Sequence, residues 1–146
     1  GLIFTAPNAD PAGRSLASLT EEFVESRDNA VMATSLGSQL YLSVMKVSDV
    51  VVGNSSSGLY EAPSFSIPTI NIGNRQDGRL RAESVVDCAP IRQEIVSALR
   101  LALNTKFDGV QNPYGDGTSS SKILNHLREY VCYRDLLKKK FSLSGN

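Results

Sequence analysis

Hydrophobic residues in this chain form short continuous runs that alternate with longer amphipathic segments. The runs predict β-strands over residues 2–6, 31–34, 50–53 and 69–72, with a weaker one over 84–87. Apolar residues spaced three or four apart predict helices over 15–28, 39–47, 59–65, 91–103 and 119–140. Continuous apolar strands that alternate with helices are typical of a parallel sheet covered on both faces. We therefore expect residues 1–146 to form a single three-layer α/β domain.

The spacing also predicts which side chains of the helices face the core. These apolar faces are Leu16, Leu19 and Phe23; Leu40, Val44 and Val47; Ile91, Ile95 and Leu99; and Ile123, Leu127 and Val131.

Composition narrows the classes of partner. The chain has 146 residues, of which 41% are hydrophobic and 21% charged, and its formal net charge is zero. These values fit a folded globular protein. A neutral chain has no overall field to attract nucleic acid or anionic lipid, and no apolar run is long enough to span a membrane. We expect neither nucleic acid nor membrane as a partner, and any anion site must be local.

The remaining single features predict no metal or redox chemistry. Cys88 and Cys132 are far apart in the sequence, which favours reduced thiols in a cytoplasmic protein, as does the lack of a basic leader. We interpret His126 as a surface or packing histidine and expect no metal and no cofactor. The chain begins inside a strand, so we expect it to be part of a larger protein.

Three polar, glycine-containing loops follow predicted strands, at residues 7–13, 53–58 and 73–81. Ligands of parallel α/β sheets bind beyond the carboxyl ends of the strands, so we expect these loops to share one edge. The central loop reads Gly53-Asn54-Ser55-Ser56-Ser57-Gly58. Its hydroxyls, its amides and the start of the next helix could bind a phosphate, or a serine could simply cap the helix.

Glu61 favours a nucleotide over a plain anion. If Ser57 is the N-cap, Glu61 lies one residue beyond the capping-box position, so it does not simply reach back to cap the helix. A structural alternative is that a carboxylate in the first turn interacts favourably with the helix dipole. A carboxylate beside phosphate needs another partner, and a ribose diol is one that acidic residues bind in dinucleotide folds.

Charged residues of the other two loops are weaker candidates. Arg75, Arg79 and Arg81 follow the fourth strand, and Arg75 is the best placed to clamp a phosphate, although any one of them could be solvated. In the first loop, Asn8 and Asp10 favour turn formation over chemistry, and Arg14 could face an anion or lie on the first helical turn.

A longer block begins with the loop Gly53-Asn54-Ser55-Ser56-Ser57-Gly58, continues through Glu61-Ala62-Pro63-Ser64-Phe65 and Pro68-Thr69-Ile70-Asn71-Ile72-Gly73, and ends with Arg75-Gln76-Asp77-Gly78-Arg79. This block resembles the UDP-N-acetylglucosamine 2-epimerase family. The hydrolysing branch is the most similar, and the opening Thr5-Ala6-Pro7-Asn8-Ala9-Asp10 resembles it too. The resemblance covers roughly the middle third of the chain, with compatible flanks.

The resemblance implies two Rossmann-like domains in a glycosyltransferase-B arrangement, with this chain as the C-terminal, UDP-binding half. It implies that Ser56, Ser57 and Gly58 hold the pyrophosphate, that Glu61 binds the ribose, and that Arg75 lies near the diphosphate or sugar. Asn8, Asp10, Arg14, Asn54, Ser55 and Arg79 are further candidate contacts. The family eliminates UDP across C1–C2 and adds water to the glycal, giving N-acetylmannosamine or a related 2-epimer for sialic-acid-type pathways.

The same resemblance implies that the acid and base residues belong mainly to an N-terminal domain, and that the parent enzyme is a homodimer. Many members carry a histidine after the first strand of this domain, whereas this chain has Ala6-Pro7-Asn8. That histidine's role cannot be transferred. Two alternatives stay open: the donor domain of a glycosyltransferase with the same architecture, and a nucleotide-binding module without chemistry.

Overall fold

The computed structural model describes residues 1–7, 13–129, 134 and 137, and it confirms an α/β fold with parallel strands. In chain order its elements are β1 (Leu2–Thr5), α1 (Gly13–Glu25), β2 (Ala30–Ala33), α2 (Gly37–Lys46), β3 (Val51–Gly53), α3 (Ser57–Tyr60), the 3₁₀-helix η1 (Ala62–Phe65), β4 (Thr69–Ile72), β5 (Val85–Cys88), α4 (Arg92–Asn104) and α5 (Ser119–Arg128). The helix predicted over 59–65 is thus split into α3 and η1.

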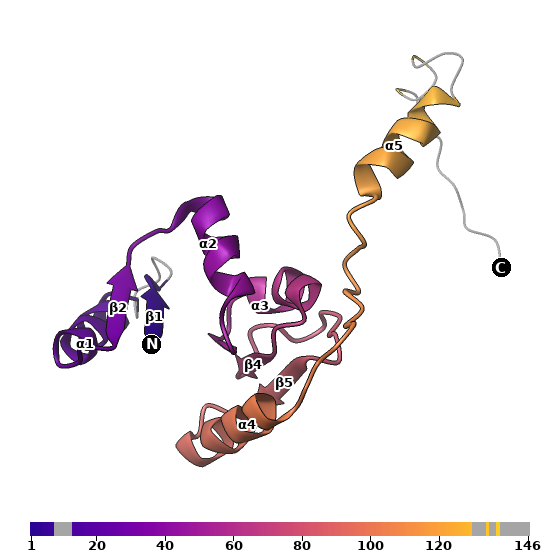
Figure 1. Ribbon diagram of the computed structural model, residues 1–146. Coiled ribbons are helices and arrows are strands. Elements are labelled where there is room, and N and C mark those ends of the chain that lie inside the picture. The colour runs from indigo at the N-terminus through magenta and orange to yellow at the C-terminus, as the bar shows by residue number, and fades with distance from the viewer. Residues whose placement is uncertain (8–12, 130–133, 135–136, 138–146) are drawn as a thin grey trace.

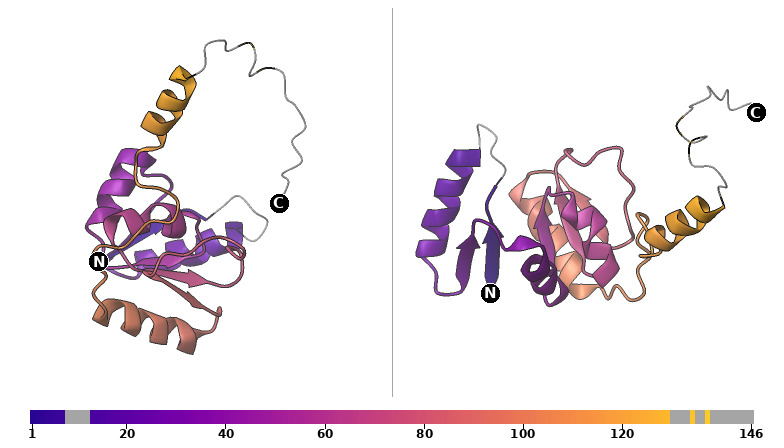
Figure 2. Two further views of the ribbon diagram at one scale, coloured as in Figure 1. Left: turned by 90° about the vertical axis from the view of Figure 1, so that its right-hand side faces the viewer. Right: turned by 90° about the horizontal axis from the view of Figure 1, so that it is seen from above.

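The strands form two parallel sheets, which corrects the expectation of one continuous sheet. Strand β1 pairs with β2, and β4 lies between β3 and β5. The two sheets lie apart, with α2 between them in the chain (Figures 1 and 2). Apolar runs identify buried parallel strands, but they do not specify which strands are neighbours.

The three-stranded sheet has the predicted three layers. On one face Ile70 of β4 packs with Ala98 and Ala102 of α4, and these three form the buried core cluster. On the other face Thr69 Oγ1 donates a 2.8 Å hydrogen bond to the carbonyl of Gly58 in α3. This bond holds α3 against the beginning of β4.

The two-stranded sheet has a helix on one face. Phe4 of β1 meets Phe23 of α1 edge-on, with ring centroids 5.6 Å apart. On the opposite face Ile3 and Val31, which are paired in register, are both exposed. Leu16 and Leu19 of α1 are exposed as well, and Phe23 is 36% exposed, so the predicted apolar face of this helix is only partly covered.

The predicted faces of the other helices are also only partly correct. In α2 it is Met45 that is buried, whereas Leu40 and Val47 are exposed, because this helix packs against η1 and not against a sheet. In α4 the small Ala98 and Ala102 are buried. Small residues let the helix approach the sheet closely.

Helix α5 lies away from both sheets, beyond an irregular segment that follows α4 (Figure 1). Its Ile123 and Leu127 are exposed, and Val131, the third residue of its predicted face, lies outside the described residues. Within the described part of the chain, no helix has the length and apolar character needed to cross a membrane.

Candidate functional site

The polar turn between β3 and α3 is the centre of the candidate site. Ser56, not Ser57, is the N-cap of α3, and its hydroxyl makes no capping hydrogen bond. Ser57 is the first helical residue, and its hydroxyl lies 2.7 Å from that of Tyr41. The hydroxyl of Ser56 therefore does not cap the helix, whereas that of Ser55 accepts from the amide of Ser57 at 3.4 Å. Helix α3 is a single turn, so hydroxyls and amides of the turn, more than a helix dipole, would meet an anion.

Glu61 lies at the end of α3 and not in its first turn. It is the C-cap residue, and its amide donates to the carbonyl of Ser57 at 2.9 Å. A carboxylate at the end of α3 gains nothing from the dipole of that helix, and although Glu61 is also the N-cap residue of η1, its side chain makes no capping hydrogen bond there. Its Oε2 atom is buried and has no hydrogen-bond partner among the described residues. A buried carboxylate oxygen is costly without a donor, so this atom is suited to a ligand that brings one.

The loop after β4 holds the turn in place through one carbonyl. Gln76 Nε2 donates to the carbonyl of Asn54 at 2.6 Å, and Arg75 Nη1 donates to the same oxygen at 3.1 Å. Gln76 is only 2% exposed, whereas Arg75 is exposed. The structure thus brings the exposed Arg75 to the turn, through its bond to the carbonyl of Asn54.

The other two arginines differ in their partners. Arg79 Nη1 donates to Gln76 Oε1 at 2.6 Å, and its guanidinium lies 5.3 Å from the centre of the Tyr60 ring. Arg81 turns away, with its Nε 2.6 Å from Asp87 Oδ2. Arg79 therefore borders the turn, whereas Arg81 anchors the loop to the sheet.

The ion pair between Arg81 and Asp87 is connected to the central strand β4. Asn71, buried on β4, donates from Nδ2 to Asp87 Oδ1 at 2.6 Å, so Asp87 joins Asn71 to Arg81. Both ends of the loop that carries Arg75 and Gln76 are thus tied to β4.

Gly58 has a packing role. A Cβ atom at this position would lie 2.5 Å from Thr69 Cγ2, too close for any side chain unless Thr69, the strand or the helix moves. The amide of Gly58 donates to Ser55, and its carbonyl accepts from Thr69. Glycine here lets α3 lie against β4, which sets the position of Ser56 and Ser57.

The first of the three predicted loops falls mainly on residues outside the described part of the chain. The strand before it, β1, belongs to the two-stranded sheet, whereas β3 and β4, which precede the other two loops, belong to the three-stranded sheet. Arg14 is exposed on α1, the helix that packs against β2 of the two-stranded sheet. Asn8 and Asp10 lie outside the described residues.

Sequence reasoning missed three residues that support the site. Gln76 is buried in a loop that looks solvated, and Tyr41 bonds Ser57 from α2. Asn112 donates from Nδ2 to the carbonyl of Tyr60 at 2.8 Å and to Ser64 Oγ at 2.7 Å. Their partners are distant in sequence, so no local pattern reveals them.

Gln76 offers a direct test of this support. We expect Gln76→Met to lower the free energy of unfolding by about 1–2 kcal/mol, because two part-buried hydrogen bonds are lost while the side-chain volume is kept. Urea denaturation measures the change, and Gln93→Met on the exposed face of α4 is the matched control. Equal stability of the two variants would contradict the role of Gln76 in holding the turn in place.

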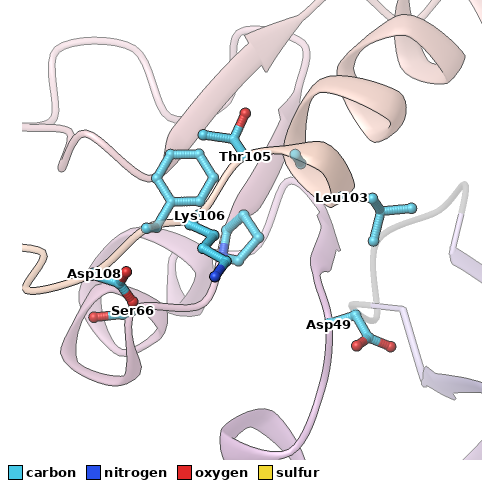
Figure 3. A pocket seen from close by; sticks show the side chains of 9 residues that line it. Asp49, Ser66, Leu103, Thr105, Lys106 and Asp108 are labelled. Carbon is cyan, nitrogen blue, oxygen red and sulfur yellow. The ribbon is translucent and has the colours of Figure 1, made fainter.

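An open hollow of about 370 Å³ lies at the opposite edge of the three-stranded sheet (Figure 3). Its lining includes Asp49 and Pro68, which precede β3 and β4, and Lys106 after α4. It carries both signs of charge and shares no residue with the turn. Parallel sheets bind ligands at the carboxyl ends of their strands, so the turn is the better candidate.

The described residues contain no group of three or more His, Cys, Asp or Glu that could hold a metal ion. Cys88 is a free, half-buried thiol, and Cys132 lies outside these residues. Burial raises the pKa of the Cys88 thiol, and the nearby carboxylates of Glu94 and Asp87 raise it further. A raised pKa disfavours the thiolate and hence nucleophilic chemistry at this position.

Known proteins resemble this chain in sequence and in fold. The sequence profile of UDP-N-acetylglucosamine 2-epimerase matches residues 1–128. A Campylobacter jejuni protein named GDP/UDP-N,N'-diacetylbacillosamine 2-epimerase (hydrolyzing) is 45% identical over 87 residues, 59% of this chain and 23% of that protein. A Legionella pneumophila protein named UDP-N,N'-diacetylbacillosamine 2-epimerase (hydrolyzing) is 32% identical over 94% of this chain and 36% of its own length.

The solved structure of UDP-GlcNAc 2-epimerase from Methanocaldococcus jannaschii in complex with UDP-GlcNAc and UDP has a TM-score of 0.67 to this chain. It is 18% identical and matches 86% of this chain and 35% of that one, which supports the fold. The chain therefore spans about a third or less of the relatives it matches. Since the family profile covers most of the sequence and the fold agrees, the chain belongs to the UDP-N-acetylglucosamine 2-epimerase family.

Proposed function

We propose that this chain is the UDP-binding part of a hydrolysing 2-epimerase that acts on an N-acetylated UDP-sugar. The observation that carries the proposal is the serine turn beside Glu61. The hydroxyl of Ser56 is not used to cap α3, and one carboxylate oxygen of Glu61 is buried without a partner. The names of the relatives support the reaction class.

Each group has a distinct role in this proposal. The hydroxyls of Ser56 and Ser57 donate to diphosphate oxygens, and Arg75 supplies positive charge from the neighbouring loop. Glu61 accepts hydrogen bonds from the ribose hydroxyls, which satisfies its buried oxygen. The chain thus binds the leaving group, and binding is strongest where negative charge develops as the bond from C1 to the diphosphate breaks.

The overall reaction consumes one water and releases UDP and a free sugar inverted at C2. The proton leaves C2 on one face and returns on the other, which needs acid and base groups beside the sugar. We place these groups in a preceding domain of the same enzyme. In this proposal the parent is a cytoplasmic homodimer that uses no cofactor, because the UDP-sugar itself is the substrate.

Calorimetry of the 146-residue chain tests the binding part of the proposal. We expect UDP to bind, with ADP and inorganic phosphate binding more weakly. Binding of ADP as tight as that of UDP, or no binding of UDP, would overturn it. Product analysis on the full-length protein tests the reaction, because a sugar transferred to an acceptor would indicate a glycosyltransferase instead.

A further inference from the structure

The hydroxyl of Tyr41 contacts one of the two serines of the turn from a different element. Tyr41 lies on α2, its side chain is half-buried, and its oxygen is 2.7 Å from Ser57 Oγ. No other hydrogen bond of the Tyr41 hydroxyl is found among the described residues. The contact joins two groups that are 16 residues apart in sequence.

The direction of this hydrogen bond decides what Ser57 can offer a ligand. Each hydroxyl has one proton, and either oxygen could be the donor in this pair. If Ser57 donates to Tyr41, it presents only lone pairs, which repel a phosphate oxygen. If Tyr41 donates, the Ser57 proton is available to an anion. A phenol is also the stronger donor of the two, so an anion beside Ser57 selects the second arrangement.

We propose that Tyr41 is a positioning residue that makes Ser57 a hydrogen-bond donor to the diphosphate of the ligand. Tyr41 donates to Ser57, and Ser57 donates to a phosphate oxygen. Aligned hydrogen bonds polarise one another, so the second bond is stronger than a lone serine would make. The proposal rests on the proposed function, since it concerns the group that binds at this turn.

A purely structural role of the Tyr41 hydroxyl would have a different effect on the variant Tyr41→Phe. The contact could simply tie α2 to α3, since α2 also packs against η1. Tyr41→Phe removes the hydroxyl and keeps the ring, so packing is retained. If the contact were only a tie, this change would lower stability without a specific effect on phosphate binding.

A double-mutant cycle separates these roles. UDP affinity is measured by calorimetry for the wild-type chain, Tyr41→Phe, Ser57→Ala and the double variant. We expect Tyr41→Phe to weaken UDP binding about three- to tenfold, in line with the loss of one hydrogen bond. In the Ser57→Ala background we expect it to have no further effect. Thermal melting of each variant checks that the fold is kept.

Tyr114→Phe is the matched control. It removes a tyrosine hydroxyl that donates to the carbonyl of Leu80 at 3.1 Å, and it leaves Ser57 untouched. We expect it to keep wild-type affinity for UDP. Tyr41→Phe with wild-type affinity, or with the same loss in the presence and absence of the Ser57 hydroxyl, would overturn the inference. Failure of the wild-type chain to bind UDP would instead overturn the proposed function.

Discussion

Replacing Glu61 by glutamine is expected to weaken UDP binding by roughly 10- to 100-fold. Hydrogen bonds to a charged acceptor contribute about 1.5–3 kcal/mol, and the amide loses the charge while keeping the shape. The buried Oε2 atom has no hydrogen-bond partner among the described residues, so Glu61→Gln should not lower the free energy of unfolding. Calorimetry gives the affinity, and urea denaturation gives the free energy of unfolding.

Two comparisons make this result specific. Glu83→Gln removes the same charge from an exposed position and should leave the affinity unchanged. The wild-type chain should bind UDP more tightly than 2′-deoxy-UDP, and this preference should disappear in Glu61→Gln, where the diol has lost its acceptor. If Glu61→Gln keeps both the affinity and the preference, Glu61 does not bind the ribose.

Gly58→Ala is expected to lower the free energy of unfolding by about 2–3 kcal/mol. The new Cβ would lie 2.5 Å from Thr69 Cγ2, so Thr69 must rotate out of its bond to the Gly58 carbonyl, or the helical turn or the central strand must move. Forcing an extra methyl group into a packed interior typically costs about 1–3 kcal/mol, and here the neighbour belongs to a buried strand. Urea denaturation of the two chains measures the difference.

Thr69, the residue that the new methyl group would contact, provides the control. Thr69→Ser removes the clashing methyl group but keeps the hydroxyl that bonds the carbonyl of Gly58. We expect Gly58→Ala to cost much less in the Thr69→Ser background. An equal cost in both backgrounds would show that the clash with Thr69 is not the cause.

The sequence predicts the elements of this fold well because each depends on local pattern. The β4 strand is found over the predicted residues 69–72, and the parallel arrangement follows from the continuous apolar runs. The division of the strands into two sheets depends on which strand edges pair, and the sequence of each strand alone does not specify this pairing. The exposed Leu40 and Val47 show the same limit, because α2 packs on η1 and not on a sheet.

The candidate site also contains some residues that the sequence predicts and others that it does not. Ser56, Ser57 and Arg75 could be placed together from sequence because each follows the carboxyl end of an adjacent strand. Gln76 and Tyr41 could not, since a glutamine in a polar loop normally faces water and a tyrosine on a helix normally packs. Their roles depend on contacts across the fold.

The two donors that converge on the Asn54 carbonyl have a consequence for the entropy of binding. Gln76 and Arg75 restrict the turn before any ligand arrives. Fixing the backbone of one residue costs about 1–2 kcal/mol of conformational entropy, and here that cost is met when the chain folds. A ligand that meets an ordered turn keeps more of its interaction energy as affinity. The buried amide of Gln76 therefore contributes to recognition without touching what is recognised.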